Sequence, residues 1–516
     1  MKKFFKRLYR IFLSRYAISA LLLLLEVVLI LHIIFSNFAS LGYLLIATLV
    51  LGLISLLNLV NKNTDPEYKI PWVITIIVLP IAGPVLYWCF YNRRMSIGES
   101  GFLKNTFALL SDTEEEKLTP LAELYRQDPS AAGKAHALMN DDPIARPYRN
   151  TDATFFPSGE KYFASLIKDL STAQKYIFLE YFIIDEGSLW DSIHKILVEK
   201  AASGLDVRVI YDDIGCMKTL PSYYERDLRR EGIRTVRFNR VSPKISPVHQ
   251  NRDHRKICVI DGRVGYTGGV NIADEYNNTI SRFGYWKDGG IKICGEAVSG
   301  LIKLFLSGWD YASRTVSDSA EILRSVAASP SPDGGFYIPF GTGPTPIYKN
   351  SVGENVFLNL VNQATEYVYV TTPYLIVDYN LTVALRNAAL RGVDVRIVTP
   401  GIADKKIIKL MTKSAYPYLI EAGVKIYEFR PGFIHEKTFI CDGRYAVIGT
   451  LNLDYRSLTH NFECGIWVYN SPVVGVATEE FMRTLDDCER MDKKKSRLTM
   501  NEWLFKTLIR IFAPLM

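Results

Sequence analysis

The chain has 516 residues, and 61 Lys and Arg against 54 Asp and Glu leave a formal net charge of +7. This near balance excludes a strongly polybasic nucleic-acid binder, and a hydrophobic content of 48% excludes a chain kept disordered by low hydrophobicity. The length allows three or four domains. The seven cysteines are scattered, without a C-x-x-C pair or histidines at ligand spacing, so neither a disulfide framework nor a structural zinc site is predicted.

Three apolar runs lie near the N-terminus, at residues 17–35, 41–59 and 72–90. Each matches the roughly 20 apolar residues that cross the hydrocarbon core of a bilayer, whereas a cleaved signal peptide has one shorter run. We therefore expect residues 1–94 to form a membrane anchor with two or three transmembrane helices. The alternative, three buried helices of a soluble domain, is disfavoured by the length of the runs.

The third run contains Pro80 and Pro84 around Gly83, so we expect its helix to kink there. Six Lys and Arg residues before the first run place the N-terminus in the cytoplasm by the positive-inside rule. Three spans would then put the soluble part of the chain outside, and two spans would keep it inside. The sequence thus indicates a multi-pass protein of the cell membrane and leaves the side of its soluble part open.

An internal repeat organises the chain after residue 150. The segment AQKYIFLEY at 173–181 resembles ATEYVYVTTPY at 364–374, and GLDVRV at 204–209 resembles GVDVRI at 392–397. In both halves, short Val, Ile and Tyr runs alternate with helical patterns, which is typical of a mostly parallel sheet covered by helices. The sequence therefore predicts an α/β fold of two duplicated lobes.

Composition marks the boundaries between these parts. Residues 95–150 are polar and are expected to form a linker with some helix. We place the first lobe at 151–315 and the second at 351–490. Ser, Pro and Gly residues mark an inter-lobe linker at 316–350, and a basic amphipathic segment follows at 491–516.

The same polar pattern, H-x-K-x4-D-x6-G-[GT]-x-N, closes both halves. Its members are His254, Lys256, Asp261 and Asn271 in the first half and His435, Lys437, Asp442 and Asn452 in the second. Because side chains alternate along a strand, the His and Lys point to one side, and the apolar residues after them are expected to form a buried strand. The Asp-Gly pair then predicts a hairpin turn that returns the Asn segment alongside the His and Lys.

Two His, two Lys and two Asn converging on one point provide two bases and several donors, which suits a tetrahedral anion. Phosphoryl chemistry fits, because one imidazole with a pKa of about 6.5 can attack phosphorus while the other, protonated, donates to the leaving oxygen. The lysines would stabilise the equatorial oxygens in place of a metal, and no cofactor is predicted. A carboxylate follows each motif. Asp288 lies 34 residues after His254 and Glu463 lies 28 residues after His435, and both are candidates for orienting the histidines.

The two motifs resemble the paired H-K-D signature of the phospholipase D superfamily. The longer segments NRDHRKICVIDG at 251–262 and GTLNLDYRSLTHNFE at 449–463 are similar to bacterial cardiolipin synthases. The segment PWVITIIVLPIAGP at 71–84 resembles the membrane anchor of that family, so the likeness covers nearly the whole chain. The motif pair is very specific for the superfamily and less specific for the substrate.

The resemblance implies two lobes that share one active site, a phosphohistidine intermediate and no catalytic metal. The implied reaction joins two phosphatidylglycerols into cardiolipin and releases glycerol. In the family the motif aspartates, here Asp261 and Asp442, are more structural than catalytic. One departure is Gly289-Gly290 after Asp288, where the family has Thr-His. By position, the resemblance makes His254 the nucleophile and His435 the general acid, and it puts Lys256, Lys437, Asn271 and Asn452 on the phosphate.

The C-terminal segment is consistent with a lipid substrate. Residues 503–516 form a helical pattern with an apolar face, and Lys506 and Arg510 lie on another face. A short basic amphipathic helix of this type lies in the interface of an anionic membrane, and the alternative is a helix docked on the protein.

Other functions share part of this pattern. Hydrolysis of phospholipids, or phosphatidyl transfer to another alcohol, differs only in what attacks the phosphohistidine. A membrane-tethered nuclease is disfavoured by the apolar runs and the near-neutral charge, so no nucleic-acid partner is predicted. A catalytically inactive lipid-binding scaffold is disfavoured because both motifs are complete.

Overall fold

The computed structural model describes residues 42–91, 97–241, 251–345, 347–348, 350–497 and 499–512. The chain divides into two compact units. One unit combines Met1–Met95, Val241–Gln250 and Thr507–Met516, and the other comprises Ser96–Arg240 and Asn251–Lys506. The first predicted span, residues 17–35, lies outside the described residues.

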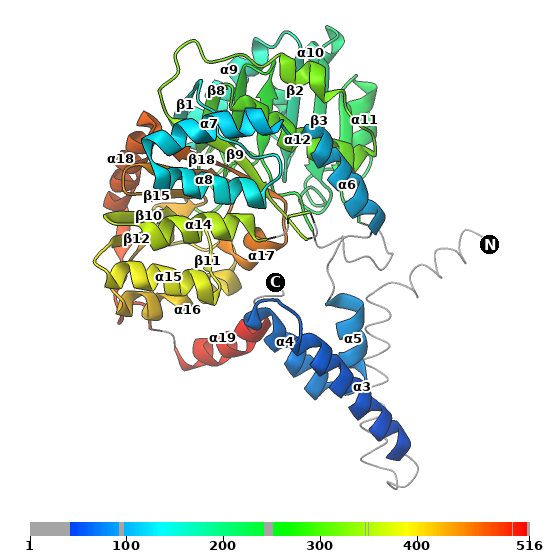
Figure 1. Ribbon diagram of the computed structural model, residues 1–516, viewed down its shortest axis with the longest axis vertical. Helices are drawn as coiled ribbons and strands as arrows, with labels where there is room; N and C mark the ends of the chain where they lie inside the picture. Colours follow the sequence, from blue (N-terminus) through cyan, green and yellow to red (C-terminus); the bar gives the residue numbers. More distant parts are fainter. Residues whose placement is uncertain are drawn as a thin grey trace, which may run out of the picture. The chain divides into compact units, whose positions relative to one another are not determined.

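The described part of the N-terminal unit is helical (Figure 1), with α3 (Gly42–Val60), α4 (Pro66–Val78) and α5 (Ala82–Phe90). Leu59 of α3 packs with Trp72, Ile76 and aromatic residues of α5 in one small core. Across the described ranges, no helix combines the length and the apolar character that crossing a membrane requires.

The run at residues 72–90 does not form the single kinked helix that we predicted. The Trp72 ring lies 6.1 Å from the Tyr91 ring, so α4 and α5 fold back on one another. Gly83 permits this reversal, because a Cβ there would lie 2.3 Å from the carbonyl oxygen of Thr75. The prediction of one helix was wrong because the Pro and Gly residues break the helix completely instead of bending it.

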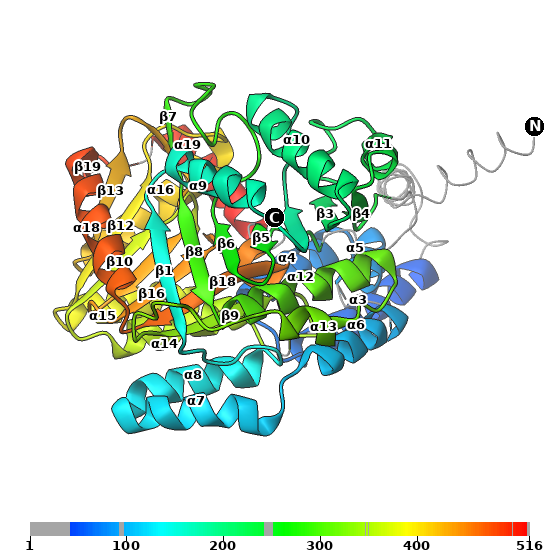
Figure 2. The same ribbon diagram turned by 90° about the horizontal axis from the view of Figure 1, so that it is seen from above.

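The larger unit begins with helices α6 (Ile97–Leu110), α7 (Glu114–Gln127) and α8 (Pro129–Asp141). Figures 1 and 2 show α7 and α8 running side by side. Thr113 and Glu116 form a reciprocal capping box that starts α7. The range 95–150, predicted as a linker with some helix, is therefore largely helical.

Within the described residues, the first lobe contains a seven-stranded sheet. Its strands, in spatial order, are β1 (Thr151–Phe156), β8 (Gly290–Gly295), β6 (Val264–Gly268), β5 (Ile257–Ile260), β2 (Tyr176–Tyr181), β3 (Asp206–Asp212) and β4 (Arg234–Phe238). Its helices are α9 (Gly159–Ser171), α10 (Ser188–Ala202), α11 (Tyr224–Arg230), α12 (Val298–Ser313) and α13 (Ser319–Arg324).

The second lobe repeats this plan with an eight-stranded sheet in the described part of the chain. Its order is β19 (Cys488–Arg490), β13 (Lys425–Phe429), β12 (Asp394–Pro400), β10 (Tyr367–Thr371), β15 (Thr438–Cys441), β16 (Tyr445–Gly449), β18 (Glu463–Tyr469) and β9 (Phe336–Thr342). Its helices are α14 (Val352–Gln363), α15 (Tyr379–Leu390), α16 (Lys406–Glu421), α17 (Tyr455–Thr459) and α18 (Pro472–Asp486). The predicted duplication into two α/β lobes is confirmed.

Both sheets are mixed, which corrects the prediction of mostly parallel sheets. Strands β2, β3 and β4 are parallel, as are β10, β12 and β13. The hairpins β5–β6 and β15–β16 and their outer neighbours add antiparallel strands to each parallel core. The repeated segments that we compared fall mainly on β2, β3, β10 and β12, so the comparison covered only the parallel part of each sheet.

The Asp-Gly pairs form the predicted hairpin turns. Asp261 and Gly262 have φ of 56° and 66°, and Asp442 and Gly443 have φ of 50° and 63°. Positive φ at both central residues is the geometry of the type I′ turn. The Asp261 carboxylate accepts backbone N–H groups from residues 174–176 at 2.7–3.0 Å, and Asp442 repeats this pattern in the second lobe. Both aspartates thus brace the start of a parallel strand, at the opposite end of β5 or β15 from the histidine.

Two further segments have more structure than their composition indicated. The range 316–350 contains α13 and also β9, which pairs antiparallel with β18 at the edge of the second sheet. At the C-terminus, α19 (Met500–Phe512) forms where an amphipathic helix was predicted.

Candidate active site

Two short cross-lobe pairings bring the motifs together. The His254 N–H donates to the Phe462 carbonyl oxygen at 2.8 Å, and the Phe462 N–H donates to the Arg252 carbonyl oxygen at 2.8 Å. In the second pairing, β14 (Gly432–Ile434) lies parallel to β7 (Tyr285–Lys287), and the His435 N–H donates to the Lys287 carbonyl oxygen at 2.7 Å. Each histidine therefore follows a segment that is paired with the other lobe.

The histidines and the two candidate carboxylates form crossed pairs. His254 Nδ1 lies 2.8 Å from Glu463 Oε2, and His435 Nδ1 lies 2.7 Å from Asp288 Oδ2. All four side chains are buried, and both carboxylates are fully enclosed. Each acid thus contacts the histidine of the opposite lobe, and in both rings Nε2 is the nitrogen turned away from the carboxylate.

The two carboxylates are held by different partners. Glu463 accepts hydrogen bonds from Thr450 at 2.5 Å, Ser457 at 2.7 Å and Asn461 at 3.3 Å. Asp288 accepts the N–H of Gly289 at 2.8 Å. The hydroxyl and amide donors around Glu463 were not predicted, although they lie in the segment whose likeness to cardiolipin synthases we noted.

Glycines make room for Asp288. A Cβ at Gly269 would lie 2.1 Å from Asp288 Oδ1, whereas the equivalent residue of the second motif, Thr450, contacts its carboxylate through its hydroxyl. A Cβ at Gly289 would lie 2.0 Å from the Phe156 carbonyl oxygen. The Gly289-Gly290 departure from the family pattern is thus required by close backbone packing, and Asp288 still reaches its histidine.

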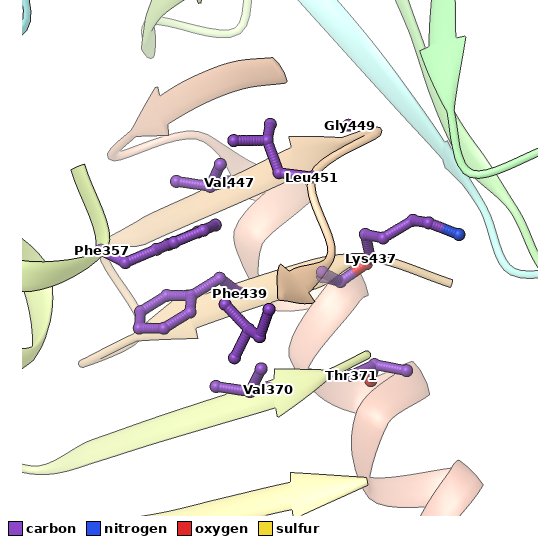
Figure 3. Close-up of a pocket in the computed structure, with 10 residues that line it drawn as sticks. Phe357, Val370, Thr371, Lys437, Phe439, Val447, Gly449 and Leu451 are labelled. Atoms are coloured by element: carbon purple, nitrogen blue, oxygen red, sulfur yellow. The ribbon is translucent and has the colours of Figure 1, made fainter. Parts of the chain in front are cut away.

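Both motif lysines are buried beside the histidines. Lys256 Nζ donates to the His254 carbonyl oxygen at 2.7 Å, and Lys437 Nζ lies 2.8 Å from His435 Nδ1. Figure 3 shows Lys437 at the start of β15, with its ammonium directed away from the apolar side chains of Phe439 and its neighbours. The apolar packing below the strand therefore supports the stem of the lysine while its charge faces the site.

The two motif asparagines differ in their partners. Asn271 Oδ1 accepts the Ile183 N–H at 3.1 Å, and Asn271 Nδ2 donates to the Tyr276 hydroxyl at 2.7 Å, which leaves one amide N–H for a ligand. In the described part of the chain, the buried Asn452 Oδ1 has no hydrogen-bond partner. Equivalent positions of the repeat thus have unequal surroundings.

Aromatic rings surround the histidines unequally. The Phe182 ring centre lies 4.9 Å from that of His254. Around His435, the corresponding distances are 5.5 Å to Tyr276, 5.6 Å to Trp286 and 5.8 Å to Phe433. Tertiary packing brings these rings to the histidines, and no sequence motif predicted them.

Buried ion pairs flank His254 on both sides in the sequence. The Arg252 guanidinium lies 2.8 Å from the Asp212 carboxylate. Arg255 contacts Asp253 at 3.0 Å and Glu180 at 2.7 Å. Residues 252–255 are thus anchored to the ends of β2 and β3, which holds His254 in place.

Burial dominates the electrostatics of the site. It lowers the pKa of both histidines well below the usual value, and the charges of Lys256 and Lys437 lower it further. Burial also raises the pKa of Glu463 to about 7 and that of Asp288 to about 6. Burial therefore favours the neutral imidazole in each pair. A carboxylate that has lost its proton can accept the Nδ1–H and leave the lone pair of Nε2 free.

The described residues include no cluster of three or more His, Cys, Asp or Glu side chains that would hold a metal ion. The charge that faces the histidines comes instead from the two lysines. Burial lowers the pKa of Lys256 to about 8 and that of Lys437 to about 7.

The fold and the site define a two-lobed α/β protein of the phospholipase D type, with one histidine, one lysine and one carboxylate from each lobe at a shared centre. A family model described as the phospholipase D-like domain of cardiolipin synthase matches residues 166–279 and 357–485. A second model, described as a phospholipase D-nuclease N-terminal region, matches residues 47–90.

Full-length relatives agree with these matches. A cardiolipin synthase of Halalkalibacterium halodurans is 33% identical over 469 residues, which is 88% of this chain and 90% of the relative. An uncharacterized protein of Streptococcus mutans is 38% identical over 472 residues, or 90% of this chain and 99% of the relative. The crystal structure of a phosphatidylserine synthase from Haemophilus influenzae has the same fold, with a TM-score of 0.55 at 16% identity, covering 74% of this chain and 98% of the other. The chain belongs to the cardiolipin synthase family of phospholipase D-like proteins.

The lysines predict how activity depends on pH. Both side chains are charged below their lowered pKa values of about 7 and 8 and neutral above them, so kcat/KM should fall as the pH rises through this range. In the variant Lys437→Arg the guanidinium keeps its charge, so the loss should move to higher pH even if the rate is lower. Initial rates measured from pH 6 to 10 test this. An alkaline limb at the same pH in the wild type and in Lys437→Arg would contradict it.

Proposed function

We propose that the chain is a phosphatidyltransferase that joins two phosphatidylglycerols into cardiolipin and releases glycerol. The observation that carries this proposal is the pair of buried histidines, each held by a carboxylate of the opposite lobe beside a lysine. Membership of the cardiolipin synthase family supports the substrate. The phosphate diester of a phospholipid is the group that such a site can bind and attack.

In the first step, His254 Nε2 attacks the phosphorus of one phosphatidylglycerol, and the bond from phosphorus to the glycerol oxygen breaks. His435 must carry a proton on Nε2 when the anionic substrate is bound, and it gives this proton to the oxygen, which leaves as glycerol. In the second step, His435 removes a proton from a glycerol hydroxyl of the second phosphatidylglycerol. The resulting oxygen attacks phosphorus, the bond to His254 breaks, and cardiolipin is released.

The other motif residues support these steps. Glu463 and Asp288 hold Nδ1 of the two rings, so that Nε2 of each faces the substrate. We assign Lys256, Lys437, Asn271 and Asn452 to the phosphate oxygens, where the ammonium groups stabilise the charge of the transition state without a metal ion. Asp261 and Asp442 act on the fold, because they hold backbone N–H groups at the far end of the strands.

A direct assay tests the reaction. Purified protein supplied with phosphatidylglycerol alone, in EDTA, should form cardiolipin and free glycerol in equal amounts, because no other acceptor or metal is needed. Lipid mass spectrometry and an enzymatic glycerol assay measure the two products. Phosphatidic acid as the main product would favour a hydrolase, and products that appear only with another alcohol would favour a different transferase.

The two histidines should be indispensable. His254→Ala and His435→Ala should each reduce turnover by several orders of magnitude, because nucleophile and acid act as one unit and their losses are not additive. Phosphatidylglycerol labelled in its phosphatidyl group should leave an acid-labile phosphatidyl group on His254 in the wild type, which peptide mass spectrometry can locate. Label on His435 would exchange the two roles, and substantial turnover of either variant would contradict the shared site.

We further propose that residues 1–94 anchor the protein in the cell membrane as a multi-pass segment. Helix α3 carries an exposed apolar stripe at helical spacing, which favours contact with lipid. Its members, each at least half exposed, include Ile46, Leu49, Val50, Leu53, Ile54, Leu57 and Val60. The match of residues 47–90 to an N-terminal family model supports the same role.

The C-terminal segment 491–516 is proposed to lie on the anionic surface of the same membrane. A groove of about 690 Å³ between α16 and α19 is lined by cations and apolar residues, which include Lys493, Arg497, Lys506, Met500 and Trp503. Trp503 and Met500 are 52% and 77% exposed, as expected for side chains that enter a lipid interface.

Deleting residues 1–94 tests the role of the anchor. The truncated protein should keep its turnover on phosphatidylglycerol in mixed micelles, because the chemical groups lie in residues 151–490, and should lose it on vesicles, where the anchor supplies effective concentration. Removing residues 503–516 should act in the same direction and more weakly. Equal losses in the two assays would show that these segments shape the active site itself.

A further inference from the structure

Two loops at equivalent positions of the repeat lie at the active-site end of the sheets. One follows β3 and the other follows β12, at the carboxyl ends of the parallel strands. Each loop carries an isoleucine at the same position of the repeat. Ile214 lies ten residues after Gly204, and Ile402 lies ten residues after Gly392, where the two glycines open the repeated segments GLDVRV and GVDVRI. These isoleucines are 41% and 42% exposed.

The first loop is tied directly to the nucleophile's surroundings. Asp212 accepts the N–H of Ile214 and of Gly215, both at 2.9 Å, and the same carboxylate binds Arg252. A Cβ at Gly215 would lie 2.1 Å from the carbonyl oxygen of Phe182, whose ring contacts His254. The loop that exposes Ile214 is thus packed against the wall of the site.

The second loop is tied to the other half of the site. The Tyr374 hydroxyl donates to Asp404 at 2.6 Å, and Lys405 Nζ lies 5.9 Å from the Tyr374 ring centre. The Gly401 N–H donates to the Phe429 carbonyl oxygen at 2.8 Å. Phe429 lies shortly before β14, the strand that leads to His435. The charge of Lys405 reaches His435 and contributes to lowering its pKa.

Each loop places a second apolar side chain and cations beside its isoleucine. Met217 is 60% exposed and is followed by the exposed Lys218, and Ile407 is 42% exposed and is preceded by the exposed Lys405 and Lys406. The acidic residues of the loops have partners, because Asp213 lies 3.0 Å from Arg237 and Asp404 lies near Tyr374 and Lys405. Each loop therefore carries exposed apolar side chains together with one or more exposed lysines.

A single exposed apolar side chain is ordinary on a protein surface. Here the same position is exposed in both repeats, beside one shared site, and lysines flank both. Exposed apolar side chains with lysines next to them in the sequence match the interface of a membrane that contains anionic lipids, where apolar atoms enter the acyl region and ammonium groups meet phosphates.

We propose that these two loops, residues 213–218 and 401–407, form a rim that contacts the anionic phospholipid bilayer on both sides of the active site. This inference rests on the proposed function, because it takes both substrates to be lipids of this bilayer. Each loop would guide one lipid from the membrane to the phosphate site, with its acyl chains along the apolar side chains and its headgroup near the lysines.

The test places a fluorescent probe on the rim of the full chain. Cys89 is the exposed cysteine among the seven, all of which are free, so Cys89→Ser provides the background. In this background Ile214→Cys or Ile402→Cys is labelled with a bimane thiol probe, and the protein is reconstituted into phosphatidylglycerol vesicles that contain brominated acyl chains. The matched control is Leu390→Cys, which is 66% exposed at the end of α15 that precedes β12.

We expect brominated lipid to quench the probes at 214 and 402 several-fold more than the probe at 390. Quenching should weaken when Lys405 and Lys406 are replaced by Gln or when salt is raised, because the lysines meet anionic headgroups. Equal quenching at all three positions, or quenching at one loop only, would overturn the proposal. If the probes are shielded in detergent as much as in vesicles, and this shielding increases with protein concentration, the rim contacts a second copy of the chain and not the bilayer.

The readout does not depend on turnover, so it separates this proposal from the proposed reaction. Rim contact in a protein that makes no cardiolipin would support the rim and contradict the reaction. The variant Ile214→Asn/Ile402→Asn should lose several-fold more activity on vesicles than in mixed micelles, whereas Leu390→Asn should lose no more on vesicles than in micelles.

Discussion

The structure of the site depends on the exchange of carboxylates between the lobes. His254 needs Glu463 and His435 needs Asp288, and each partner comes from the other half of the chain. Separation of the lobes would break both pairs and leave the two imidazole rings unoriented. The cross-lobe strand pairings at Phe462 and at β7–β14 hold these pairs together, so the active centre exists only in the assembled pair of lobes.

The same burial sets the proton balance of the site. It raises the pKa of the acids and lowers that of the imidazoles and lysines, so every group moves toward its neutral form. Such a centre suits an anionic substrate, because a bound phosphate supplies the negative charge that keeps the lysines protonated. Burial thus favours neutral imidazoles and lysines when the site is empty, and a bound phosphate favours the charged form of the lysines.

The sequence was informative where residues act through local geometry. The repeated motif predicted the buried strands β5 and β15 and the hairpin turns at the Asp-Gly pairs, since both depend on near neighbours. The spacing of Asp288 and Glu463 marked them as candidates for orienting the histidines. It did not predict that each acid contacts the histidine of the other lobe, because only tertiary packing determines which histidine each acid meets. The aromatic rings around His435 and the mixed character of the sheets escaped prediction for the same reason. The run at 72–90 shows a further limit of prediction from sequence. It is long enough for one helix, but the chain reverses at Gly83 in close contact with the backbone of α4 and forms two helices.

In the mechanism that we propose, the differences between the repeats can separate the roles of the two chemically identical histidines. His435 is enclosed by three aromatic rings, whereas His254 contacts one, so His254 has the less crowded position for an imidazole that must reach phosphorus. Glu463 accepts three side-chain hydrogen bonds besides its contact with His254, and a ring fixed in this way would suit the proposed nucleophile. Asp288 has fewer donors around it, and Gly269 takes the place of the hydroxyl that Thr450 provides. A less restrained carboxylate suits a pair that must give up a proton in one step and take one back in the next.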